Sequence, residues 1–213
     1  NIKGGANYNI NENHNVFANA GYYSKQPFFN AVYPNNASVV NQNLVNEKVI
    51  GLEAGYGFRS SVFNANFNIY HTTWKDRYQR TNDNVATNPG GYYDFSGITQ
   101  VHSGVELDMN AKFDKLKLNG MVSVGNWEYK DNITGKRYDV ANNEISGGTV
   151  TTYYVDGTKV GDVAQFTASA GASYDIFKTL SVDANYRFAD KLYASLDPTK
   201  LTSATNKGTL ELP

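Results

Sequence analysis

Residues 99–113 alternate between apolar and polar side chains, and this strip constrains the fold more than any other feature of the sequence. One set is apolar apart from a serine and comprises Val101, Ser103, Val105, Leu107, Met109, Ala111 and Phe113. The other set is polar apart from a glycine and comprises His102, Gly104, Glu106, Asp108, Asn110 and Lys112. A period of two indicates a β-strand with one apolar and one polar face. The strip is longer than the roughly ten residues that a tilted strand needs to cross a bilayer.

The same alternation recurs along the chain and predicts eight strands. They are expected at residues 1–10, 14–23, 47–58, 62–74, 99–113, 116–129, 163–176 and 179–191. Short turns join them into four hairpins, at Asn11–Asn13, Arg59–Ser61, Asp114–Lys115 and Phe177–Lys178. Long segments rich in Asn, Gly and Tyr separate the hairpins, at residues 24–46, 75–98 and 130–162. Short turns at one end and long loops at the other are typical of bacterial outer-membrane β-barrels.

The composition by itself leaves two interpretations open. Hydrophobic residues make up 40% of the chain and the mean hydropathy is −0.51, which also suits a soluble β-sandwich or solenoid. A membrane barrel has a polar lumenal half and polar loops, so a low hydropathy does not exclude it. A sandwich gives no reason for short and long connections to alternate regularly. The order of the connections therefore favours the barrel.

Charge, cysteine content and motifs exclude several functional classes. The net charge of −1 over 213 residues gives no electrostatic footprint for nucleic acid. Cysteine is absent, and His14, His71 and His102 fall on separate predicted strands without the spacing of metal ligands. The sequence contains no Gly-x-Ser-x-Gly motif, paired acid constellation or phosphate-binding loop. We therefore expect no catalytic residues, no metal site and no cofactor, and a protein that is not an enzyme.

The direction of the strands predicts where the two chain ends lie. If the short turns face the periplasm, both ends of the chain lie at the long-loop rim, whereas a free-standing barrel keeps both termini in the periplasm. We therefore interpret residues 1–213 as a partial outer-membrane β-barrel domain. The predicted fold class is all-β, an antiparallel transmembrane β-barrel segment of about eight strands in four hairpins, taken from a larger barrel.

Several motifs resemble the barrel of TonB-dependent outer-membrane transporters. In the stretch 46–78, a strand carries Glu53, Gly55 and Tyr56, and a Tyr-rich return strand ends in Trp74-Lys75-Asp76. The segments 104–108 and 125–129 resemble the next hairpin of that family, and so does the segment 160–165, followed by Tyr193-Ala194 and Asp197-Pro198. The resemblance covers nearly the whole chain and keeps the order of the motifs.

The resemblance implies the C-terminal part of a 22-stranded barrel that an N-terminal plug domain closes, with the plug and the final strands lying outside this chain. It implies active import of a scarce large nutrient, a siderophore, haem, cobalamin or oligosaccharide, across the outer membrane of a Gram-negative bacterium. The partners implied are outer-membrane lipids, the protein's own plug, the TonB complex through the N-terminal part, and a surface lipoprotein. The alternative is a passive porin or a surface adhesion barrel, neither of which needs a plug.

Two groups of residues are candidates for functional sites. Lumen-facing polar positions are expected at Glu53, Glu106, Asp108, Lys112, Asp183 and Arg187. Such residues either meet a substrate or bond to a plug, to each other or to water. Ligand-binding residues are expected on the long loops, where exposed aromatic and basic side chains form stacking platforms: Phe28, Phe29, Arg77, Arg80, Tyr92, Tyr93, Tyr153 and Tyr154. The alternative is that these aromatic residues pack against one another and order the loops.

Aromatic residues near the predicted strand ends are expected to form two girdles at the membrane interfaces. Trp74 and Trp127 belong to the girdle on the side of the long loops, together with Tyr22, Tyr129 and Phe188.

Overall fold

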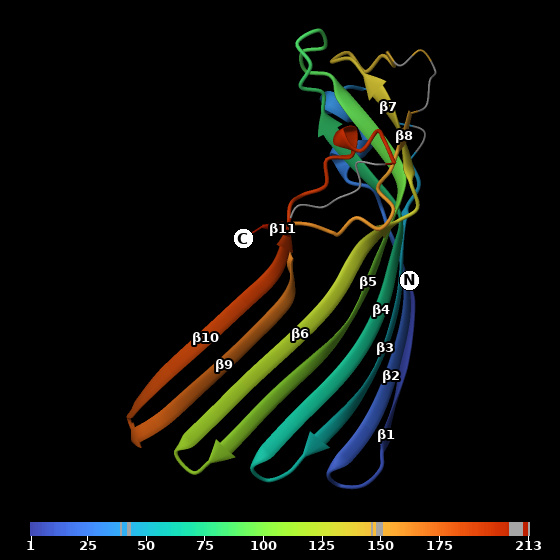
Figure 1. Ribbon diagram of the computed structural model, residues 1–213. Helices are drawn as coiled ribbons and strands as arrows, with labels where there is room; N and C mark the ends of the chain where they lie inside the picture. Colours follow the sequence, from blue (N-terminus) through green and yellow to red (C-terminus); the bar gives the residue numbers. More distant parts are fainter. Residues whose placement is uncertain (39, 42–43, 146, 148–150, 205–210, 213) are drawn as a thin grey trace.

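The computed structural model describes residues 1–38, 40–41, 44–145, 147, 151–204 and 211–212. In this part of the chain, eleven strands form one antiparallel sheet that curves along its length (Figure 1). Eight strands are long: β1 (Ile2–Asn9), β2 (His14–Lys25), β3 (Glu47–Arg59), β4 (Phe63–Asn82), β5 (Tyr92–Phe113), β6 (Leu116–Lys130), β9 (Ala164–Phe177) and β10 (Leu180–Tyr193). They lie side by side in chain order, so the prediction of eight strands in four hairpins is confirmed.

The short turns gather at one end of the sheet, at the bottom of Figure 1, and the long connections lie at the other. Each of the four predicted turns joins two neighbouring antiparallel strands. The predicted strand boundaries agree with the structure at the end with the short turns, where polar turn residues interrupt the alternation.

The strand register keeps polar and apolar residues on opposite faces of the sheet. Glu106 of β5 lies beside Asn68 of β4 and Ser123 of β6, whereas Val105 lies beside Ile69 and Val124. We call the face that carries Glu106 the polar face. The register places all six residues predicted to face the lumen on it: Glu53, Glu106, Asp108, Lys112, Asp183 and Arg187.

Strands β4 and β5 continue beyond the predicted ends, so the expectation of a loop at residues 75–98 is wrong for most of that segment. Two irregularities explain the difference: an extra residue on β4 at Asp76, with φ of 58°, and an extra residue on β5 at Gly97, with φ of 72°. Each is a β-bulge, which shifts the alternation by one position. The period-two pattern is therefore interrupted where the strands continue.

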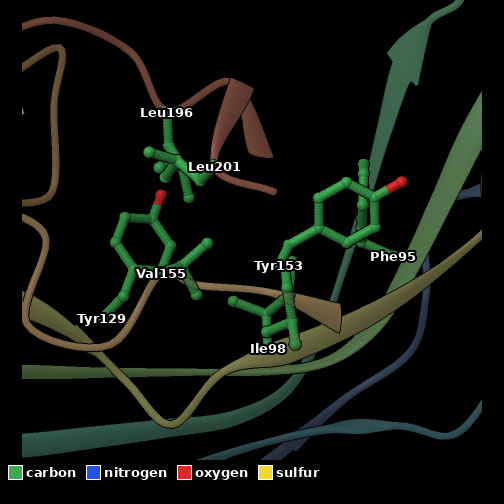
Figure 2. Packing of buried hydrophobic residues seen from close by; sticks show 8 residues of the cluster. Phe95, Ile98, Tyr129, Tyr153, Val155, Leu196 and Leu201 are labelled. Carbon is green, nitrogen blue, oxygen red and sulfur yellow. The ribbon is translucent and has the colours of Figure 1, made fainter. Parts of the chain in front are cut away.

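A second, smaller layer packs on the long-loop end of β4 and β5. Strand β7 (Ile133–Tyr138) pairs with β5, and β8 (Thr151–Tyr153) pairs with β7. Buried side chains join them to residues 194–204: Phe95, Ile98, Tyr129, Ile133, Tyr153, Val155, Leu196 and Leu201 (Figure 2). We call this region the rim layer, made of β7, β8, the outer ends of β4 and β5, and residues 194–204.

The remaining elements are short. They are the helix α1 (Phe29–Val32), the 3-10 helices η1 (Pro34–Asn36) and η2 (Pro198–Lys200), and the strand β11 (Glu211–Leu212), which pairs with β10. No helix among the described residues is long and apolar enough to cross a membrane.

The two faces of the sheet should respond differently to a charge. We expect Val105→Arg to lower the free energy of unfolding by about 2–4 kcal/mol, because the guanidinium would lie in hydrocarbon. Ser123→Arg, on the polar face of the neighbouring strand, is the matched control and should have a much smaller effect. Urea unfolding of the full-length protein in lipid vesicles measures both. Equal losses would show that the apolar face does not contact lipid.

Candidate functional site

The polar face contains a cavity of about 1010 Å³ towards the long-loop end of β1 to β6. Aromatic rings from four strands line it: Tyr23, Tyr70, Trp74, His102 and Trp127. We call this cavity and its lining the aromatic hollow. It includes both tryptophans of the chain.

Trp127 of β6 is held in one orientation by two neighbours. Its indole Nε1 donates a hydrogen bond of 2.9 Å to the Tyr70 hydroxyl oxygen. The His102 ring stacks on it, with ring centroids 5.1 Å apart and an interplanar angle of 21°. Gly104 provides the space for Tyr70, because a Cβ atom at that glycine would lie 2.4 Å from the Tyr70 hydroxyl oxygen. Trp127 is therefore a preorganised aromatic surface that lines the hollow.

Trp74 of β4 lies at the upper edge of the hollow and is held by a buried carboxylate. Its Nε1 donates to Glu47 Oε2 over 3.0 Å, and Lys25 Nζ lies 3.2 Å from the same oxygen. Lys25 Nζ also lies 4.2 Å from the centroid of the Phe28 ring. These contacts connect Phe28, in the exposed first loop, to Trp74 at the edge of the aromatic hollow.

Arg77 stacks on Trp74, with Cζ 4.1 Å from the ring centroid. In a regular strand two residues three positions apart point to opposite faces. The bulge at Asp76 adds one residue between them and so brings Arg77 to the face of Trp74. Lys48 Nζ lies 2.7 Å from the Asp76 carboxylate and stabilises the bulge.

Two carboxylates face the hollow from β3 and β5. Glu53 accepts a hydrogen bond of 3.1 Å from Asn19 Nδ2, and Glu106 accepts one of 3.3 Å from Ser123 Oγ. Neither carboxylate forms an ion pair within the described part of the chain. The lower part of the hollow therefore carries negative charge and hydrogen-bond acceptors.

The residues predicted to bind a ligand divide into two groups. Phe28 and Phe29 are 65% and 71% exposed, and Phe28 and Arg77 adjoin the aromatic hollow through Lys25 and Trp74. The remaining five, Arg80, Tyr92, Tyr93, Tyr153 and Tyr154, belong to the rim layer or to the connections within it. Whether any of the eight binds a ligand stays a prediction.

The expected exposure is wrong for Tyr92 and Tyr153, which are 2% and 4% exposed. Tyr92 stacks on Tyr138, and the Arg80 guanidinium lies 3.4 Å from the centroid of the Tyr92 ring. The reason is the pairing of β7 with β5, which covers side chains that a free loop would expose. Tyr93 also packs within the layer, with its ring centroid 6.3 Å from that of Phe95.

The aromatic hollow itself was missed by the sequence analysis, although a signal was present. Tyr70 and Trp74 occupy the same alternating set as Asn66 and Asn68, and Trp127 shares its set with Ser123. The expectation of interfacial girdles assigned both tryptophans to the lipid face, and the structure places them on the polar face instead. The alternation of polar and apolar residues, taken by itself, places both tryptophans on the polar face.

Two carboxylates at the rim, the buried Asp83 and the half-buried Asp94, have opposite pKa shifts. Burial alone raises the pKa of Asp83, but hydrogen bonds from Asn88 and Arg137 outweigh it and hold the pKa below the ordinary 3.8. Burial also raises the pKa of Asp94, and there the hydrogen bond from the Tyr78 hydroxyl and the charge of Arg80 do not compensate. The ionised form is thus favoured at Asp83 and disfavoured at Asp94.

Comparison with known proteins supplies the family. The sequence profile of the family described as TonB dependent receptor-like, beta-barrel matches residues 1–209. Among solved structures, the FpvAI–pyocin S2 complex matches with 14% identity and a TM-score of 0.57, over 90% of this chain and 22% of that one. P. aeruginosa FpvA bound to heterologous pyoverdines matches with 13% identity and a TM-score of 0.56, over 90% and 23%. These likenesses concern the fold, and this chain spans about a quarter of either structure. No curated protein matches.

The two carboxylates should respond oppositely to neutralisation. We expect Asp83→Asn to speed proteolytic cleavage of the rim layer at pH 7, because the favoured charge is lost. Asp94→Asn should leave the rate unchanged or lower it. The contribution of Asp83 is present above pH 3.8 and is lost as the pH falls through its lowered native pKa. Trypsin digestion of the full-length protein at pH 7 compares the two substitutions, and pepsin digestion at graded acidic pH follows the loss of the Asp83 contribution. Similar acceleration by both substitutions would contradict the assignment.

Proposed function

Because this chain belongs to the family of TonB-dependent receptor-like β-barrels, we propose that it forms part of an outer-membrane barrel that actively imports a scarce large nutrient. Proteins of this family are outer-membrane transporters of Gram-negative bacteria and are not enzymes. In this proposal the polar face is the wall of the lumen, and residues 1–213 are the later part of a 22-stranded barrel.

The aromatic hollow is the observation that carries the proposal. It is a cavity of about 1010 Å³, within or just above the size range of small-molecule sites, and it lies on the face that would line the lumen. Its rings are held by hydrogen bonds and stacking before any ligand arrives, which reduces the entropic cost of binding. A wall that only separated lipid from water would not need fixed aromatic rings on its polar face.

The ligand is proposed to be a siderophore, haem, cobalamin or an oligosaccharide. One structural neighbour is a receptor bound to pyoverdines, which supports the siderophore among these candidates. All four ligands have ring faces or ring edges that aromatic side chains contact well.

The partners are proposed from the family. They are a plug domain preceding this chain, the TonB complex that would energise transport through the N-terminal part, and the lipids that would contact the apolar face. A surface lipoprotein is a further proposed partner, and the exposed Phe28 and Phe29 supply apolar area for it at the long-loop end.

Energy dependence separates active import from the passive alternatives. Uptake by cells that carry the full-length protein should stop when the proton gradient of the inner membrane is dissipated or when TonB is removed. A passive porin would continue to admit its solute under both treatments, and an adhesion barrel would admit none under any condition. Continued uptake without TonB would therefore end the proposal.

The hollow should contribute directly to ligand affinity. We expect Trp127→Ala to raise the half-saturation concentration for uptake about 3- to 10-fold, because a stacked aromatic contact is worth about 0.5–1.5 kcal/mol beyond its buried area. Tyr186→Ala is the matched control, since Tyr186 lies on the apolar face of β10 and is 67% exposed. Both variants should reach the outer membrane at normal levels. An unchanged half-saturation concentration in Trp127→Ala would remove the hollow from the binding site.

A further inference from the structure

A second, smaller cavity of about 160 Å³ lies at the edge of the rim layer and shares no lining residue with the aromatic hollow. We call it the rim pocket. The residues that matter for its chemistry are Arg77, Tyr78 and Gln79 of β4, Tyr129 of β6, and Ser195 and Leu196 of the connection after β10. Sites for nutrient-sized molecules have volumes of about 300–1,000 Å³, so the rim pocket suits only a much smaller ligand.

Arg77 is the one charged residue among the described residues that line the rim pocket, and no carboxylate neutralises it. It forms no ion pair in the described part of the chain, and its Nε is buried without a hydrogen-bond acceptor. The nearby carboxylates of Glu47 and Asp76 are engaged by Lys25 and Lys48. Contact with the Trp74 ring holds the guanidinium but brings no negative charge. A partly buried cation without a counter-charge is costly, so the pocket lacks an anion.

The hydroxyl groups of the rim pocket add donors to this cation. The Tyr129 hydroxyl is directed towards Leu196, on the opposite wall (Figure 2). Burial raises the pKa of Tyr129, and the hydrogen bond from Gln100 and the charge of Arg77 reverse this only in part. The hydroxyl therefore keeps its proton at neutral pH, and since it accepts from Gln100, the proton is available to a ligand. Ser195 supplies a second hydroxyl, and because Ser195 is exposed, a small ion has access beside it.

The remaining polar side chains of the rim pocket are already bonded elsewhere. The Tyr78 hydroxyl donates to Asp94, and Gln79 Nε2 donates over 3.1 Å to the Leu196 carbonyl oxygen. The available groups are thus a guanidinium and two hydroxyl donors, which an acceptor with negative charge satisfies best. Water supplies acceptors but no charge.

We propose that the rim pocket binds a small inorganic anion, held by Arg77, Tyr129 and Ser195. A water-sized particle needs roughly 10–15 Å³ of such volume, so the pocket has room for a halide ion or one tetrahedral oxyanion together with water. The anion neutralises Arg77 and bridges β4, β6 and the connection after β10. It thereby holds residues 194–204 against the sheet, at the place where Gln79 already bonds to Leu196. This role is independent of the nutrient that the barrel transports.

Hydrogen exchange tests the proposal in solution. Exchange of residues 194–204 in the purified full-length protein is followed by mass spectrometry in chloride, sulfate or phosphate at equal ionic strength. Gluconate is the reference, because it is much larger than an inorganic ion. At least one inorganic anion should slow the exchange relative to gluconate. A dissociation constant of about 10 mM corresponds to exchange about tenfold slower in about 100 mM of the bound anion.

Substitutions assign this protection to the rim pocket. Arg77→Gln should abolish the dependence on the anion. Tyr129→Phe keeps the buried ring and removes one donor, so it should weaken the affinity for the anion about 3- to 10-fold. Arg59→Gln is the matched control, since it removes an exposed cation at the end of β3 beside a short turn, and it should keep the full dependence.

Crystals of the full-length protein locate the ion by anomalous scattering, with bromide in place of chloride and selenate in place of sulfate. A peak should lie beside the side chains of Arg77 and Tyr129 and be absent from Arg77→Gln crystals. A response confined to the halide or to the oxyanions supports the site and identifies its ligand.

Three results overturn the proposal. They are exchange that responds to none of the anions, a response that survives Arg77→Gln, and a crystal peak without any response in solution, which is an adventitious ion only. Should Arg77→Gln fail to fold, an unchanged anion affinity in Tyr129→Phe overturns it instead. None of these results bears on transport, which the dependence of uptake on TonB decides separately.

Discussion

The requirement that backbone polar groups be paired inside hydrocarbon governs the rest of this structure. A chain that crosses a membrane as strands must bond each N–H and C=O group to a neighbouring strand. The continuous antiparallel ladder from β1 to β10 meets this requirement between neighbouring strands. It also fixes the register. Because of the fixed register, side chains from distant parts of the sequence lie next to one another on the same face of the sheet. The aromatic hollow exists because β1 to β6 are aligned in this way.

The rim layer and the aromatic hollow are stabilised by different kinds of contact. The rim layer is held by a buried hydrophobic cluster and by the ion pair between Asp83 and Arg137, at 2.5 Å. Its tyrosines serve packing, since Tyr92 and Tyr153 are almost inaccessible to solvent. The hollow keeps its rings accessible and fixes them by their edges, through Tyr70 and Glu47. Aromatic residues with similar surroundings in the sequence therefore have different roles, depending on whether another strand covers them.

Period-two alternation predicted the long strands and the turns, and it placed the six residues expected to face a lumen on one common face of the sheet, because these features depend on local pattern alone. Where bulges or very short strands interrupt this alternation, the sequence did not predict the structure. The extensions of β4 and β5 follow bulges at Asp76 and Gly97, and strands β7 and β8 are too short to show a period. The stacking of Arg77 on Trp74 depends on one extra residue in a ladder and cannot be derived from spacing. Burial of Tyr92 depends on pairing with a strand about forty-five positions later, which only tertiary structure supplies.

The two bulges form a compensating pair. Trp74 pairs with Gln100 below them and Gln79 pairs with Phe95 above them, and these two pairs belong to the same register. An inserted residue on one strand is cancelled in the register by an inserted residue on the other, so the change of register is confined to a short window around Arg77. The alternation of faces along each strand stays shifted by one position beyond its bulge. Deleting both inserted residues would preserve every pairing and leave Arg77 two positions after Trp74, on the same face. Converting the two bulges into regular ladder without a deletion would keep the register outside the window and turn Arg77, with every residue beyond it, to the opposite face. Related sheets could thus exchange the residues on their two faces near the rim by gaining or losing such a pair of bulges, without changing the length of the sequence or the strand register.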